Sequence, residues 1–121
     1  MSFTHKHITG LLAAGLLGSS CLHAYDWKSA RAALSPQEQS IAEVSALTAV
    51  GDLNKLSPAF DRALSNGLTV NELKEVVLQL YAYVGFPRCL NAAGVLEKVV
   101  SARKAAQKGD LTGPEAQTIP A

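Results

Sequence analysis

Residues 66–87 read NGLTVNELKEVVLQLYAYVGFP, and this stretch decides the class of the fold. Thr69 and Glu72 form a capping box, in which each side chain satisfies a free backbone N–H group at the start of a helix. Apolar residues then recur every three or four positions, which is the spacing of one helix face. They are Leu73, Val76, Val77, Leu80 and Val84. We expect a helix that runs to about Val84 and ends at the corner Gly85-Phe86-Pro87.

The segment before this helix carries a similar start signal. Ser35 and Glu38 form a capping box around Pro36, whose missing N–H is no loss at the first position of a helix. We expect a helix from there to about Val50, preceded by a short helical lead-in around residues 27–33. Its apolar and small residues fall on two faces, which indicates burial on both sides.

Two further helices complete the pattern. Residues 53–65 form the weaker one, because Pro58 requires the helix either to begin at Ser57 or to bend. Gly67 ends it in the left-handed conformation. The other helix begins at Pro87 and runs to about Lys108. No stretch alternates as a strand does, so the sequence predicts an all-α protein, a small bundle of about four to five helices.

The two ends of the chain are expected to lie outside this bundle. Lys6, an apolar run over residues 8–22 and a cleavage site at Ala24 are typical of a signal peptide, since a membrane span needs ~20 apolar residues. This makes residues 1–24 a signal peptide and the protein exported, periplasmic or secreted. An uncleaved anchor, or a lipid on Cys21, remains an alternative. The helical domain is then 25–108, and residues 109–121 are expected to form a flexible tail.

Charge and size limit the partners. The chain has 11 Lys and Arg against 10 Asp and Glu, and after removal of residues 1–24 the two counts are equal. Such a balance excludes a nucleic-acid protein, and no membrane span remains after cleavage. The core is small for a stable monomer, so we expect a homo-oligomer. A small-molecule ligand is left open, and nothing indicates a metal or an organic cofactor.

Several segments carry a resemblance to a known family. They are LSPQEQSI (34–41), ALTAVGD (46–52), RALSNGLT (62–69), ELKEVVLQ (72–79) and YVGFP (83–87). Together they resemble the carboxymuconolactone decarboxylase family of the alkylhydroperoxidase-like superfamily, over about residues 34–101. The resemblance implies an all-helical protomer that assembles into a ring, commonly a trimer or a hexamer.

The resemblance also implies two chemistries, and the chain departs from both. Decarboxylases of the family transfer protons with histidines, but residues 57–61 have none and Gln79 stands where a second histidine is common. The hydroperoxidase-like branch uses a Cys-x-x-Cys pair, and residues 51–56 contain no cysteine. With residues 1–24 removed no histidine remains, so the usual proton carrier near neutral pH is absent. We therefore expect negligible decarboxylase activity.

Cys89 is the first catalytic candidate. A helix N-terminus and the adjacent Arg88 both favour the thiolate form, which would suit a weak thiol-dependent peroxidase or oxidoreductase. The alternative is that Cys89 packs as a small apolar residue. Arg88 is a candidate for binding an anionic substrate, or it caps a neighbouring carbonyl group.

Two glutamates are the other catalytic candidates. Glu38 matches the first-helix glutamate of the superfamily and would shuttle protons if burial raised its pKa, unless it only completes its capping box. Glu75 shares a helix face with Gln79 and Tyr83, so it would act as a base while they orient a small carboxylated substrate. A solvated face is the alternative. The sequence thus supports either an enzyme or a non-catalytic helical binding or assembly module.

Overall fold

The computed structural model describes residues 26–115 and 117, and the chain divides into two units, residues 1–33 and 34–121. The described part of the first unit contains the helix α2 (Trp27–Ala32), which begins where the Asp26 side chain accepts a hydrogen bond from the Lys28 backbone. The predicted lead-in helix is therefore confirmed. The predicted signal peptide, with Cys21, lies outside the described residues.

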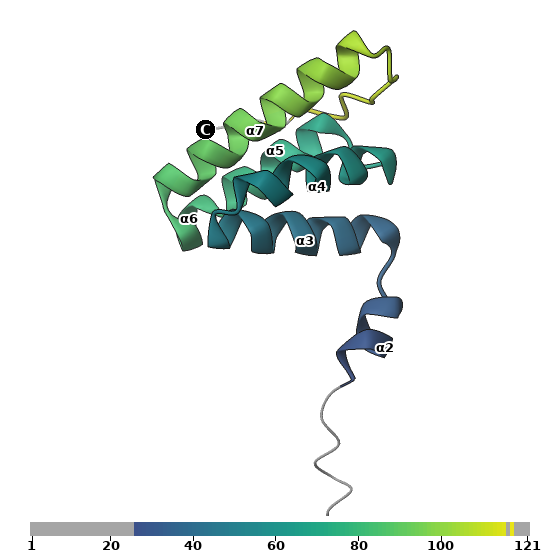
Figure 1. Ribbon diagram of the computed structural model, residues 1–121, viewed down its shortest axis with the longest axis vertical. Helices are drawn as coiled ribbons and strands as arrows, with labels where there is room; N and C mark the ends of the chain where they lie inside the picture. Colours follow the sequence, from purple (N-terminus) through teal and green to yellow (C-terminus); the bar gives the residue numbers. More distant parts are fainter. Residues whose placement is uncertain (1–25, 116, 118–121) are drawn as a thin grey trace, which may run out of the picture. The chain divides into compact units, whose positions relative to one another are not determined.

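The second unit is a helical bundle (Figure 1). Its elements are α3 (Pro36–Val50), α4 (Leu53–Ser65), α5 (Val70–Gln79), α6 (Tyr81–Val84) and α7 (Phe86–Ala105). α3 packs along α4, and both α4 and α5 pack against α7. Residues 26–115 contain no strand, so the all-α prediction is confirmed. Within the same residues no helix combines the length and the apolar character that a membrane span requires.

α3 begins and ends as its sequence predicts. The Glu38 backbone donates to Ser35 Oγ at 3.2 Å, and the Ser35 backbone donates to Glu38 Oε2 at 2.7 Å, which completes the capping box. Gly51 ends the helix with a φ of 78°, a left-handed conformation that glycine adopts without a steric penalty. Ser40, Val44 and Thr48 are its buried residues.

Pro58 lies inside α4 and does not start it. The helix begins at Leu53, because the Asp52 side chain accepts from the Lys55 backbone at 3.1 Å and caps the first turn. The expected range of residues 53–65 is confirmed, and of the two alternatives at Pro58 a start at Ser57 does not hold, because Asp52 caps the helix one turn earlier. Gly67, with a φ of 93°, follows the end of the helix as expected.

The helix predicted to run from Thr69 to Val84 is interrupted at Leu80. α5 ends at Gln79 and the single turn α6 follows. The Leu80 carbonyl accepts from both Tyr83 and Val84, at 2.9 Å each, so the ladder tightens locally. The sequence does not show the interruption, since Leu80 keeps the helical spacing of the apolar stripe.

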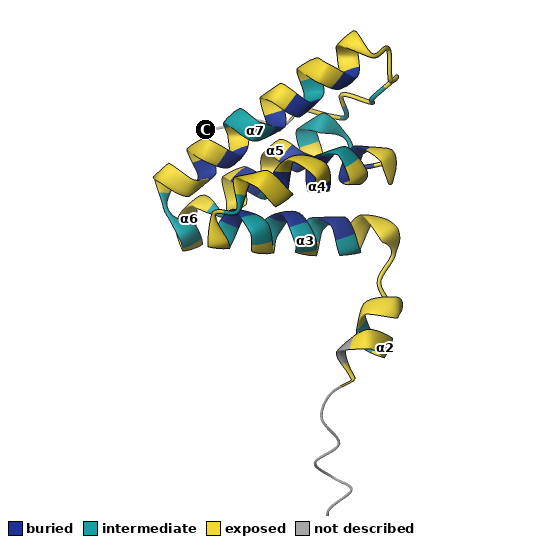
Figure 2. Ribbon diagram, in the orientation of Figure 1, coloured by how far each residue is buried: buried dark blue, intermediate teal, exposed yellow. Residues whose placement is uncertain are grey.

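The core lies between α3, α4, α5 and α7, whose buried faces point toward one another (Figure 2). Its largest fully buried apolar side chains are Phe60, Leu56, Leu73 and Val44. All four lie on stripes that the sequence predicts to be packing faces. Cys89, Ala92, Leu96 and Val99 supply the buried stripe of α7.

The segment after α7 differs from the expected flexible tail. α7 ends at Ala105, three residues before the predicted end, and residues 110–114 lie along the start of α5. We call residues 110–114 the strap. The strap carbonyls of Leu111 and Thr112 accept from the backbones of Val70 and Asn71, at 3.1 and 2.9 Å. The first turn of a helix has free N–H groups that need acceptors, but sequence periodicity does not reveal a distant acceptor.

Candidate functional site

An open groove of about 1000 Å³ runs between α5 and α7. α5 lines one side with Val70, Lys74, Val77 and Leu78, and α7 lines the other with Cys89, Leu90, Leu96 and Val100. Tyr81 and Phe86 belong to the lining as well. The groove is therefore mainly apolar. We call these residues, with Glu75, Ala93, Glu97 and Ser101, the α5–α7 groove.

Several large apolar side chains of the groove are exposed. Tyr81 is 54% exposed and Phe86 59%. Their rings meet edge to face, with centroids 6.2 Å apart and an interplanar angle of 81°. Leu78 and Leu90 are also more than half exposed. Exposed apolar side chains gathered around one groove are typical of interaction surfaces.

Cys89 lines the same groove. It is the fourth residue of α7, only 7% exposed, and a free cysteine. Its backbone N–H donates to the Gly85 carbonyl at 3.4 Å, and the corner before it depends on Gly85, which has a φ of 83°. The thiol therefore sits at a fixed point, packed as a small apolar residue.

Glu75 is the only other sequence candidate in the groove. It lines the groove from α5 and is exposed. Gln79 and Tyr83 do not line it and are exposed as well, with Tyr83 at 76%. The helix face that was to orient a substrate is thus largely a solvated face, and the structure brings together only Glu75 and Cys89.

Glu38 is engaged at the start of α3. Hydrogen bonds from Ser35, first from its backbone and then from its side chain, hold the pKa of the Glu38 carboxyl below its usual value. A proton shuttle near neutral pH requires the opposite shift. The geometry favours the capping role.

Arg88 points to α3. Its guanidinium donates to the Ala49 carbonyl in the last turn of that helix. Carbonyl groups in the last turn have no N–H donor within the helix and carry its negative partial charge, so a cation there is stabilising. This is the carbonyl-capping role that the sequence left open, and Arg88 is not among the residues that line the groove.

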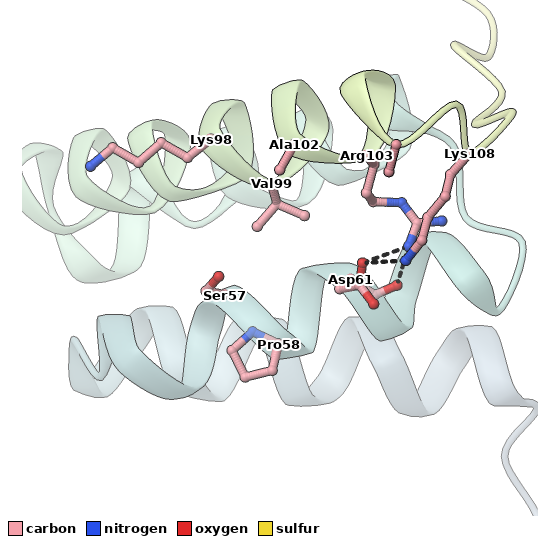
Figure 3. Close-up of a pocket in the computed structure, with 9 residues that line it drawn as sticks. Ser57, Pro58, Asp61, Lys98, Val99, Ala102, Arg103 and Lys108 are labelled. Atoms are coloured by element: carbon pink, nitrogen blue, oxygen red, sulfur yellow. Dashed lines mark hydrogen bonds and ion pairs between the residues drawn. The ribbon is translucent and has the colours of Figure 1, made fainter.

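The sequence analysis missed Arg103, which lines a second pocket of about 610 Å³ between α4 and α7 (Figure 3). Arg103 is 7% exposed. Its Nε and Nη2 donate to the two carboxylate oxygens of Asp110, at 2.8 and 2.6 Å, and its Nη1 donates to Asp61 Oδ1 at 2.7 Å. The available signal was its place on the buried stripe, four residues after Val99.

The charged groups around Arg103 are paired with one another. The hydrogen bond from Arg103 is the main cause that lowers the pKa of both Asp61 and Asp110, and the carboxylates in turn raise the pKa of Arg103. Lys108 adds a second cation 3.4 Å from Asp61 Oδ1. With both carboxylates engaged, this pocket is structural in character. Among residues 26–115, no cluster of side chains is arranged to hold a metal ion.

Comparison with known proteins identifies the family of this chain. The sequence matches the family model described as the carboxymuconolactone decarboxylase family over residues 21–98. The chain belongs to this family. No curated protein and no solved structure matches it. The resemblance inferred from the sequence is confirmed, and this member of the family carries neither a histidine nor a Cys-x-x-Cys pair in residues 25–121.

Proposed function

We propose that this carboxymuconolactone decarboxylase family member is a non-catalytic assembly module, whose α5–α7 groove is the contact surface for a second copy of the chain. The observation that carries the proposal is the set of large apolar side chains left exposed around one groove. Burying apolar surface contributes ~25 cal/mol per Å², so a second copy with the same patch would gain from covering it.

The charges of the groove fit such a contact. Lys74 stands on the α5 side, and Glu75 and Glu97 add carboxylates from α5 and α7. In a two-fold contact through this groove, Lys74 of one copy would pair with a carboxylate if it faced Glu97 of the other. Opposite charges at the rim set the register of an apolar interface.

A second surface supports assembly beyond a pair. Ala42 and Ala46 of the small-residue face of α3, which the sequence predicts to be buried, are exposed in the protomer, as is the neighbouring Val50. Two different two-fold contacts on one chain can close into an assembly with an even number of protomers, such as a hexamer. The small core of the protomer would be supported by these contacts.

The site offers little for acid–base chemistry. Residues 25–121 contain no histidine, Glu38 is held ionised in its capping box, and Glu75 is exposed to solvent. We infer that decarboxylation of a muconolactone is negligible.

One observation keeps a second candidate function, a thiol-dependent peroxidase. Cys89 and Glu75 line the same groove, so a peroxide that enters it would meet a thiol in a groove that also contains a carboxylate. The thiol sulfur would take one peroxide oxygen to give sulfenic acid and release an alcohol or water, and an added thiol reductant would return it to the thiol.

The assembly proposal is tested with two tyrosines that differ in position. Light scattering of residues 25–121 at micromolar concentration should give a mass of three or more protomers. Tyr81→Asp, in the groove, should lower that mass. Tyr83→Asp, outside the groove and more exposed, should leave it unchanged. A monomeric wild type, or equal effects of the two variants, would contradict the proposal.

A charge exchange tests the orientation of the contact. Lys74→Glu should weaken association because it places carboxylates opposite each other, and Lys74→Glu combined with Glu97→Lys should restore it. Sedimentation velocity at several concentrations measures both. Failure of the double variant to recover would show that these rims do not face each other.

The thiol alternative has its own assay. Consumption of an organic hydroperoxide with dithiothreitol as reductant is measured for the wild type, Cys89→Ser and Cys89→Ala. We expect no turnover above the buffer rate in any of them. Turnover in the wild type that both variants lose would favour the peroxidase over the assembly module.

We also propose that the protein acts after export, on the strength of its N-terminal sequence. Mass spectrometry of protein from its host should then find a chain that begins at Tyr25. An intact Met1, or a lipid on Cys21, would rule out simple cleavage after Ala24.

A further inference from the structure

The strap occupies the start of α5 chiefly through its backbone. Besides the two contacts of the Leu111 and Thr112 carbonyls, the Asn71 side-chain amide donates to the carbonyls of Gly113 and Pro114, at 3.2 and 3.0 Å. Four consecutive carbonyl groups thus meet donors of only two residues, Val70 and Asn71. An extended segment of any origin could offer the same row of carbonyls.

Two features of the strap depend on its sequence. Asp110 is held by both sides of its carboxylate against the buried Arg103, and its side chain is 12% exposed. Bidentate pairing of arginine with a carboxylate is strong and fixes orientation. Gly113, with a φ of 79°, lies against Thr69 so closely that a Cβ atom there would overlap the threonine side chain. An acidic residue and a glycine three positions later therefore define which segment fits.

The connection between α7 and the strap is short and strained. Four residues, Ala106 to Gly109, separate the helix from the strap, and Gln107 has a φ of 55°. A non-glycine residue meets a steric penalty in this left-handed region. Short connections under strain favour the exchange of a terminal element between copies of a chain.

We propose that the start of α5, together with Arg103, is a peptide-docking site that accepts the strap segment of a second copy of this chain when its own strap is released. The occupant is residues 110–114 of the other copy, with its Asp110 on Arg103 and its carbonyl groups on Val70 and Asn71. The site shares only Val70 with the α5–α7 groove, and it uses the backbone N–H of that residue.

The tethered strap sets the conditions for docking between copies. A short linker gives an effective concentration of ~1 mM, so at micromolar protein the chain's own strap occupies the site. Weakening that strap should open the site to a free peptide. Binding of a free peptide should therefore be stronger when the chain's own strap is weakened.

The experiment uses the full chain with Asp110→Ala and a fluorescent peptide of residues 108–117, KGDLTGPEAQ. Fluorescence anisotropy should show saturable binding of the peptide to the variant, and at least ~10-fold weaker binding to the wild type, where the tethered strap competes. Two control peptides should not bind: one with asparagine in place of the aspartate, and one with alanine in place of the glycine.

The outcomes separate clearly. No binding to a helical, folded Asp110→Ala chain would overturn the proposal, as would equal binding to variant and wild type. If Asp110→Ala loses its helical circular dichroism, Gly113→Ala takes its place, because its Cβ would overlap Thr69 and displace the strap from the docking site. None of these results depends on the oligomeric state of the chain, so the peptide test can fail while the groove proposal holds, and the reverse.

Discussion

α7 borders two pockets that differ in character: one contains buried, paired charges and the other exposed apolar side chains. Toward α4 it presents Arg103, a buried cation whose donors are engaged by Asp61 and Asp110. Toward α5 it presents Leu90 beside Phe86, apolar side chains that remain more than half exposed. The charged groups have their partners within one chain, whereas the apolar side chains are left exposed in the protomer. A polar residue in a pocket is therefore not by itself a sign of function, and here the apolar groove is the better candidate.

The largest effect should come from breaking the charged side. Arg103→Ala leaves two carboxylates without their common cation and detaches the strap, so we expect a loss of ~3 kcal/mol in the free energy of unfolding. Urea titration followed by circular dichroism measures it.

Arg62→Ala is the matched control for this loss. Arg62 pairs with Glu43 at 2.6 Å, but both side chains are substantially exposed, and such pairs contribute ~0–1 kcal/mol. Equal losses in the two arginine variants would contradict the contrast between a buried and an exposed ion pair.

The second largest effect on the free energy of unfolding should come from acid, which protonates the carboxylates that pair with Arg103. The pKa values of Asp61 and Asp110 are lowered in the folded chain, so their contribution is complete above the usual carboxyl pKa of ~3.9. It is lost as the pH falls from about 4 through the lower folded values. Urea midpoints measured from pH 7 to pH 2 should fall more steeply for the wild type than for Asp110→Asn, and parallel curves would exclude this coupling.

Thr48 tests how much a buried polar group without a hydrogen-bond partner lowers the free energy of unfolding. Its side chain is 1% exposed, and its Oγ1 is the one buried side-chain polar atom without a partner among the described residues. Thr48→Val removes an unsatisfied group at similar volume, so we expect a gain of ~1 kcal/mol in the free energy of unfolding. A loss of stability in the urea titration would mean that this hydroxyl has a partner, such as a buried water.

The smallest effect on folding should come from the apolar side. Leu90→Ala removes a side chain that is already exposed, so the free energy of unfolding of the dilute chain should change by less than ~0.5 kcal/mol. Association should weaken in the same variant, as sedimentation measures. A large loss of stability in the dilute chain would show that the groove belongs to the core of the protomer.

Most of the fold could be predicted from the sequence because its signals are local. Capping boxes at Ser35 and Thr69, glycine stops and apolar stripes are local signals, so they predict the helices and most of the core. The break at Leu80 leaves the periodicity intact and was missed.

The candidate site was harder to predict than the fold. That Cys89 and Glu75 share a groove, that Arg88 serves α3 and that Arg103 binds Asp61 are facts of packing between helices distant in sequence. A buried arginine shows its partners only when the chain folds, since Asp61 lies 42 positions away from it.

Gly113 has a consequence for sequence recognition. Because a side chain at this position would collide with Thr69, the start of α5 excludes every segment that has a side chain there, whatever its other residues. Under the docking proposal, Asp110-Leu111-Thr112-Gly113 would be a short linear motif of the form Asp-x-x-Gly. The chain would then contain both this motif and the site that binds it.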